Sequence, residues 1–264
     1  MKRWFLALAL AVAAGCLAVP AAVRASDGGG HPRFDPDASA PESLFAWNDP
    51  VPWRAGVVAG RSKRPVRMQG SVWDFEADSL EAMVAVAPWG WLELYGRAGG
   101  FRPKMELDGR SWGKTDVGAG GALGTQVNLW EIGPEHGTAA WRLTIGLRAE
   151  YAWRTGKELE GAKAQWGEAF FFLPVNYHLA YHGTQRSAYA SEAHALDLYV
   201  GPACSLVDGD WTPKHGTGKI GFREDQAAGI AGGIRIWLLE RLAVGGEVAW
   251  FDAVTLQGGL EYRF

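Results

Sequence analysis

Histidine and serine residues in the second half of the chain are the side chains whose spacing could support chemistry. His178 and His182 are four residues apart, a spacing that on a helix places two imidazoles on one metal ion. On a strand the same pair lies about 13 Å apart, too far to share an ion, so we expect no metal site. Ser191 and His194 are residue types of a hydrolase, but strand spacing does not bring a nucleophile to its base. The sequence also lacks Walker and CxxC motifs, and we predict no catalytic residue and no cofactor.

A second set of candidate functional residues consists of charged side chains that alternate with apolar ones. Five are basic and five are acidic, each on the polar face of a predicted strand: Glu93, Arg97, Arg142, Arg148, Glu150, Asp197, Arg235, Glu247, Glu261 and Arg263. Buried charges need partners, because an unpaired one costs several kcal/mol. If the strands close into a barrel, we expect these residues to fill its lumen with ion pairs. Equal numbers of the two signs argue against strong selectivity for anions or cations.

The segment 141–153, with the sequence WRLTIGLRAEYAW, shows which element carries these charges. Its odd positions are apolar or aromatic from Trp141 to Trp153, and its even positions include Arg142 and Arg148. Such alternation predicts a β-strand with one apolar and one polar face. Twelve steps of roughly 3.3 Å, tilted by about 40°, cover roughly 30 Å, which is the thickness of the hydrocarbon core of a bilayer. We therefore expect the apolar face to contact lipid.

The same alternation recurs along most of the chain, less cleanly. It is present in residues 54–61, 81–88, 91–101, 117–129, 169–181, 193–206, 229–238, 242–250 and 254–264. The position of the first strand is ambiguous, because residues 66–72 also alternate. With 54–61 as the first strand, we predict an all-β fold, an antiparallel transmembrane β-barrel of about ten strands. Barrels of eight or twelve strands are the alternatives, since single-chain bacterial barrels have even numbers.

Aromatic residues stand at the ends of several predicted strands, in a sequence that holds 14 tryptophans. Trp and Tyr are enriched at both membrane–water interfaces, where their amphipathic rings lie at the level of the headgroups. We therefore predict an aromatic girdle formed by Trp130, Trp141, Tyr151, Trp153, Trp237 and Trp250.

The connections between predicted strands indicate how the barrel is oriented. Long polar connections alternate with short ones: 62–80, 102–116, 155–166 and 208–226 against 88–90 and 239–241. Because the long loops of bacterial barrels are extracellular and the short turns periplasmic, we predict long loops outside the cell. Two connections fit this scheme poorly, since 183–192 is long for a periplasmic turn and 251–253 is short for an outer loop.

Residues 1–25 have the features of a secretory signal peptide. Basic residues precede an apolar run that is too short to span a bilayer, and small residues lie at the −3 and −1 positions of the predicted cleavage site. We predict cleavage between Ala25 and Ser26. The tetrapeptide Ala-Ala-Gly-Cys keeps lipidation of Cys16 as an alternative.

The rest of the chain divides into two predicted parts. Residues 26–53 are rich in Asp, Pro, Gly and Ala and show no periodicity, so we predict a flexible segment, with the barrel in 54–264. The chain of 264 residues has a net charge of −3 and no basic block, and we expect no nucleic-acid partner. After cleavage only Cys204 would remain of two cysteines, so stability must come from the fold and not from a disulfide.

The last residues, Leu260, Tyr262 and Phe264, alternate with polar residues and end the chain on an aromatic ring. This pattern resembles the C-terminal assembly signal of bacterial outer-membrane β-barrel proteins, which the barrel-assembly machinery reads. With the export signal and the strand set, the chain resembles the small barrels of OmpA-like size, without a periplasmic domain after the barrel. The resemblance implies a porin-like membrane protein of a Gram-negative outer membrane, surrounded by outer-membrane lipid.

These observations leave three hypotheses of function. The first is a structural or surface-interaction role, with a filled lumen and long extracellular loops that meet an unknown ligand. The second is a small channel or transporter for polar solutes. The third is a lipid- or peptide-cleaving enzyme at the rim of the barrel, which the residue spacing disfavours.

Overall fold

The computed structural model describes residues 53–89, 91–107, 110–133, 139–159, 162–181, 194–213, 218–239, 241–252 and 254–264. All of them belong to one compact unit, Ser39–Phe264. Among these residues no helix has the length and apolar character needed to cross a membrane. The predictions for the signal peptide, for Cys16 and for a flexible segment lie outside the described residues, except that Trp53 is the first residue of a strand.

Thirteen strands form one antiparallel sheet. They are β1 (Trp53–Met68), β2 (Ser71–Trp89), β3 (Leu92–Leu107), β4 (Arg110–Lys114), β5 (Gly118–Ile132), β6 (Ala139–Leu159), β7 (Ala162–Phe172), β8 (Val175–Tyr181), β9 (His194–Thr212), β10 (Ile220–Glu224), β11 (Ala228–Trp237), β12 (Leu242–Trp250) and β13 (Val254–Arg263).

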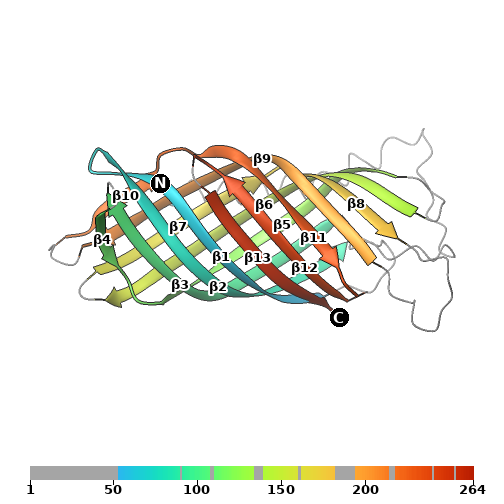
Figure 1. Ribbon diagram of the computed structural model, residues 1–264, viewed down its shortest axis with the longest axis horizontal. Helices are drawn as coiled ribbons and strands as arrows, with labels where there is room; N and C mark the ends of the chain where they lie inside the picture. The colour runs from blue at the N-terminus through green and yellow to red at the C-terminus, as the bar shows by residue number, and fades with distance from the viewer. Residues whose placement is uncertain are drawn as a thin grey trace. The chain divides into compact units, whose positions relative to one another are not determined.

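Ten strand positions close this sheet into a barrel, with the strands inclined to its long axis (Figure 1). The barrel closes at β1, which pairs with β2 on one side and with β13 on the other. β7 and β8 share one position, because both pair with β6 and with β9. The predicted all-β, ten-stranded antiparallel barrel is therefore confirmed, with β4 and β10 as two additional strands.

The break between β7 and β8 has a local cause. Residues 169–181 were expected to form one strand, but Pro174 has no N–H group to donate to the ladder. The backbone bonds at the break reach across it, since Gly146 N–H donates to the Pro174 carbonyl at 2.9 Å and Leu173 N–H to the Pro202 carbonyl at 3.1 Å.

The two ends of the barrel differ in construction. At one end, the terminal end, Phe264 N–H donates to the Trp53 carbonyl at 2.9 Å, so the first and last strands meet there. We call the opposite end the distal end. Six strands continue there past β11, β12 and β13, namely β1, β2, β3, β6, β7 and β9. β10 fills the space between β9 and β1 by pairing with both. We call this distal part of the wall the extension; Figure 1 shows β4 and β10 at its end of the barrel and β8 at the other.

The extension replaces most of the long loops that the sequence predicts. Residues 62–80 are not a loop: β1 runs to Met68 and β2 starts at Ser71, with a two-residue turn between them. Gln69 and Gly70 in this turn have φ of 51° and 82°, the positive values that a tight hairpin turn requires. Most of 102–116, 155–166 and 208–226 is also strand. The segment 66–72, the alternative first strand, belongs to the same hairpin as 54–61.

The interior of the extension is apolar. We call the buried side chains that fill it the apolar plug: Val66, Met68, Trp73, Phe75, Ala77, Phe101, Met105, Ala162, Ala164, Trp166, Val207, Trp211 and Phe222. Their rings pack edge to face, with centroid distances of 5.2 Å for Phe75 and Trp166 and 6.2 Å for Phe101 and Trp166. Such packing is typical of a solid protein core, and it closes the distal end of the lumen.

The outer surface changes character at the base of the extension. Toward the terminal end it is apolar and exposed, for example at Leu123, whose exposed fraction is 75%, and Trp250, at 66%. On the extension it carries ion pairs instead, such as Lys63 with Asp74 at 3.0 Å. Soluble monomers rarely expose so large an apolar surface, and an apolar belt around a closed barrel is the mark of a membrane-spanning one. We call this belt the lipid band.

Candidate functional site in the barrel lumen

The charged residues predicted to line the lumen lie on the inner face of the barrel wall. Arg148 of β6 reaches across the interior to Glu247 of β12 at 2.8 Å. Arg148 Nε also donates to the Tyr95 hydroxyl at 2.9 Å, and that hydroxyl donates to Glu150 at 2.8 Å. Arg97 makes an ion pair with Glu150 as well. These five residues tie opposite walls together, and we call them the central network.

A second set of ion pairs lies nearer the terminal end. Arg54 contacts Glu93 and lies 2.6 Å from Glu261, and Glu261 also accepts Arg235 at 3.2 Å. Of the three remaining predicted residues, Arg142 and Asp197 line the larger cavity described below. Arg263 follows Glu261 by two positions and so shares its inner face of β13, without lining either cavity.

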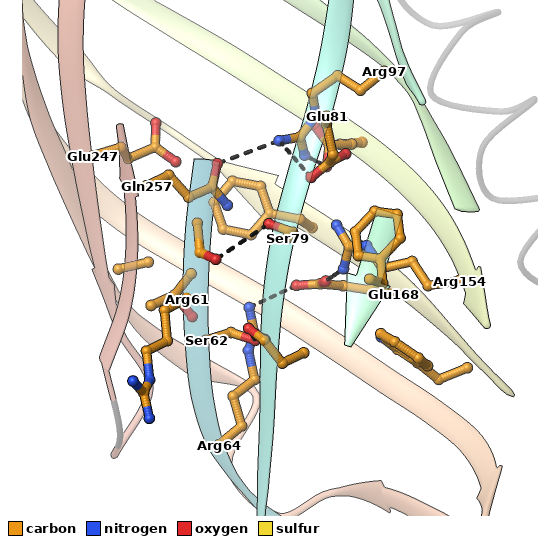
Figure 2. A pocket seen from close by; sticks show the side chains of 18 of the residues that line it. Arg61, Ser62, Arg64, Ser79, Glu81, Arg97, Arg154, Glu168, Glu247 and Gln257 are labelled. Carbon is orange, nitrogen blue, oxygen red and sulfur yellow. Dashed lines mark hydrogen bonds and ion pairs between the residues drawn. The ribbon is translucent and has the colours of Figure 1, made fainter. Parts of the chain in front are cut away.

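A third set, next to the plug, escaped the sequence prediction. Glu168 lies between Arg64, at 2.6 Å, and Arg154 (Figure 2). Arg64 also contacts Glu224 at 3.1 Å. Ser205 donates to Glu224 at 3.1 Å. We call these five residues the distal cluster. Glu224 is the last residue of β10, which lies beyond the lipid band. Burial of its carboxyl group raises the pKa of Glu224 to about 7. At neutral pH this carboxyl group is therefore partly protonated.

Sequence reasoning missed these residues for two reasons. Arg64, Arg154, Glu168 and Glu224 fall in or beside segments that were predicted to be loops. Arg54 and Glu81 occupy inward positions of predicted strands, so the same alternation could have found them. Glu81 lies 3.7 Å from Arg97, which Figure 2 shows between Glu81 and Gln257.

Two cavities lie inside the described part of the barrel. A cavity of about 40 Å³ lies between the central network and the distal cluster. It has room for water, and Glu81 Oε2 and Arg97 Nε at its wall have no hydrogen-bond partner among the described residues. A larger cavity, of about 160 Å³, lies on the terminal side of the central network, and we call it the terminal cavity.

The predicted aromatic girdle needs one correction. Trp130, Trp141, Tyr151, Trp153 and Trp250 are exposed on the outer face. Trp237 is not, since its exposed fraction is 6% and its Nε1 donates to Asp197 Oδ2 at 3.1 Å inside the lumen. Its position at a strand end suggested the girdle, but it shares the inner face of β11 with Arg235 because the two are two residues apart. Leu260, Tyr262 and Phe264 point outward and are exposed.

The described residues contain no group of three or more His, Cys, Asp or Glu that could hold a metal ion. His178 forms a hydrogen bond with Asp197 through Nδ1. His182 and Ser191 lie outside the described residues, and His194 is the first residue of β9.

Comparison with known proteins finds likeness of fold only. No family model and no curated protein matches the chain. The outer membrane protein OprG from Pseudomonas aeruginosa is 11% identical with a TM-score of 0.39, over 81% of this chain and 95% of that one. The transport unit of the autotransporter AIDA-I from Escherichia coli is 10% identical with a TM-score of 0.38, over 82% and 91%. The COG4313 outer membrane channel from Pseudomonas putida is 12% identical with a TM-score of 0.34, over 87% and 100%.

Similarity at this level says nothing about function. The type of barrel is therefore assigned from the strand pairing and the lipid band. A closed antiparallel barrel of ten strands, apolar outside and charged inside, is a small β-barrel of the outer-membrane type. Its lumen is filled by paired charges in the middle and by apolar side chains at the distal end.

Proposed function

We propose that this protein is a closed barrel of the bacterial outer membrane, which does not conduct solutes and presents its extension outside the cell as a rigid binding surface. The apolar plug is the observation that supports this most directly. Trp211 and Phe222, at 0% and 2% exposure, lie where a channel would need a water-filled exit. Below them the distal cluster and the central network cross the lumen, so a solute would have to break both ion pairs and packing.

The proposed orientation follows from the two ends of the barrel. Bacterial barrels hold both chain ends in the periplasm and extend their larger connections outward. Here the first and last strands meet at the terminal end, and the hairpins project from the distal end. The charged outer face of the extension also suits water beyond the membrane. Export by the predicted signal peptide and assembly through Leu260, Tyr262 and Phe264 remain predictions that fit this placement.

The extension suits surface binding because it is built of paired strands. The outer face of β1 and β2 carries both signs of charge in fixed positions: Arg61 lies 3.1 Å from Glu76, and Lys63 lies 3.0 Å from Asp74. A surface held by a continuous ladder loses little conformational entropy when it binds, whereas a long loop would have to be ordered first. The paired strands of the extension therefore support the surface-interaction hypothesis, in place of the long loops that the sequence predicted.

Conductance across a planar bilayer tests this proposal against the channel hypothesis. We expect the purified wild-type barrel to give no steady opening, because the plug and the ion-pair layers leave no continuous water path. A gel in which the inserted protein migrates differently before and after boiling would show that a folded barrel was present. A steady ohmic pore of constant size in the wild-type protein would overturn the proposal.

A further inference from the structure

The terminal cavity has a feature that the proposed surface role does not use. Four side chains from four neighbouring strands lie in one row along its wall: Arg142 of β6, His178 of β8, Asp197 of β9 and Arg235 of β11. Each is the direct cross-strand partner of the next, so their Cβ atoms are about 5 Å apart. All four line the cavity, with an arginine at each end of the row.

Beyond Arg235 the same row continues with two glycines, which have no side chains. Arg235 pairs with Gly245 of β12, and Gly245 pairs with Gly259 of β13. Both glycines occupy inward positions and line the cavity. An added Cβ would lie 3.0 Å from the Ile234 carbonyl at Gly245 and 3.0 Å from the Val57 carbonyl at Gly259, so both positions favour glycine and leave room beside the row of charged residues.

The hydrogen-bonding capacity of this row favours an acceptor-rich occupant. Asp197 is engaged on both oxygens, by His178 and by Trp237 Nε1. Arg235 contacts Glu261 through one nitrogen, at 3.2 Å, and Glu261 also takes Arg54. A guanidinium group carries five N–H donors, so Arg235 has more donors than this one shared carboxylate satisfies. Arg142, whose Nε lies 2.8 Å from Glu131, supplies a second guanidinium at the other end of the row.

We propose that the terminal cavity is a binding site for a small oxyanion, a carboxylate or phosphate compound held between Arg142 and Arg235. Three strand spacings of about 4.8 Å separate their backbones by about 14 Å, a span that two arginine side chains can narrow from both sides. Cavities of about 150 Å³ hold ligands of benzene size, so 160 Å³ admits a compound of about six to ten non-hydrogen atoms. The plug closes the distal end, so the ligand enters from the terminal end. This site does not depend on what the extension binds.

Calorimetric titration of the folded, detergent-solubilised barrel with inorganic phosphate and with succinate tests the site. We expect saturable, one-site binding of at least one of the two anions, and the one that saturates identifies the favoured group. Arg235→Gln should weaken that binding about tenfold or more, because a charge-assisted hydrogen bond is lost. Gly245→Val should abolish it, because the added side chain occupies the space beside Arg235, with its Cβ 3.0 Å from the Ile234 carbonyl and 3.6 Å from Arg235 Cβ.

A matched control separates loss of the site from damage to the barrel. Gly96→Val introduces the same side chain on the outer face of β3, away from the cavity lining, where an added Cβ would meet Leu123 Cδ2 at 3.5 Å and the Ala122 carbonyl at 3.8 Å. It should bind the anion within about twofold of wild type, since the cavity is untouched, and each variant should retain its heat-modifiable mobility. The proposal is wrong if neither anion gives saturable binding to the wild-type barrel. It is equally wrong if Arg235→Gln and Gly245→Val, both folded, bind like wild type.

Discussion

Glu168 is one of the interior carboxylates that are shared by two arginines. It is the shared carboxylate of two buried arginines, Arg64 at 2.6 Å and Arg154. Removing one partner of a buried ion pair leaves the other charge uncompensated, which costs about 3–5 kcal/mol. We therefore expect Glu168→Gln to lower the free energy of unfolding by about that amount, measured by urea denaturation of the folded barrel.

The matched control for this prediction is a carboxylate whose partner is exposed. Asp74 pairs with Lys63 at 3.0 Å on the outer face of the extension, and such surface pairs contribute less than about 1 kcal/mol. Asp74→Asn should therefore change the unfolding free energy by less than about 1 kcal/mol. If Glu168→Gln were equally mild, the ion pairs of Glu168 with Arg64 and Arg154 would not stabilise the barrel as buried pairs should.

At the same scale, the inward charges could be predicted because alternation decides which way a strand residue points. Glu93 and Glu261 follow this rule, and both lie among the interior ion pairs. Trp237 shows where a position-based argument fails, since the alternation that placed Arg235 inside places Trp237 inside too. Which charges pair with which could not be predicted, because the partners come from strands far apart in the sequence, such as Arg148 and Glu247.

At the scale of elements, strand existence was predictable and strand length was not. Alternation in a membrane segment sets apolar residues against polar ones, as in 141–153. In the extension the pattern inverts, because the outer face meets water and the inner face packs in the plug. Asp74 and Glu76 therefore alternate with Trp73 and Phe75, and the charges were interpreted as those of a polar loop. Gly70 could have indicated the hairpin between β1 and β2, since glycine is common in tight hairpin turns.

This turn also gives the prediction for the β1–β2 hairpin. Gly70 has a φ of 82°, and an added Cβ would meet nothing within 4 Å, so a substitution there tests backbone conformation alone. We expect Gly70→Ala to lower the unfolding free energy by about 1 kcal/mol, the cost of holding a residue with a side chain in the left-handed region. Urea unfolding monitored by tryptophan fluorescence measures it.

Gly218 provides the comparison, because its Cβ would also meet nothing within 4 Å but its φ is not in the left-handed region. Gly218→Ala should change the free energy of unfolding by less than about 0.5 kcal/mol, as surface substitutions usually do. An equal loss in both variants would mean that the hairpin turn is not held in this conformation.

At the scale of the whole molecule, one strand passes through two surroundings. β2 directs Leu80 and Val84 outward in the lipid band, and Asp74 and Asp78 outward on the extension. Its inner face changes in the opposite sense, from Glu81 in the charged lumen to Phe75 in the plug. The molecule is therefore apolar outside and polar inside in the membrane, and polar outside and apolar inside beyond it. This reversal places the boundary of the lipid band between Leu80 and Asp78.

Two valines on β2 allow this boundary to be tested, because they differ in little except their position along the barrel. Val72 and Val84 both point outward, and their exposed fractions are 48% and 51%. An arginine on the lipid face costs about 2–4 kcal/mol at the middle of the bilayer, and Val84 lies about midway between Trp89 and Asp78. We expect Val84→Arg, opposite Ala55, to lower the free energy of unfolding from lipid vesicles by that amount. Val72→Arg lies in water opposite Arg67 and should lower it by less than about 1 kcal/mol. Equal effects of the two substitutions would mean that both valines face the same solvent, and neither the lipid band nor the closed membrane barrel would then stand.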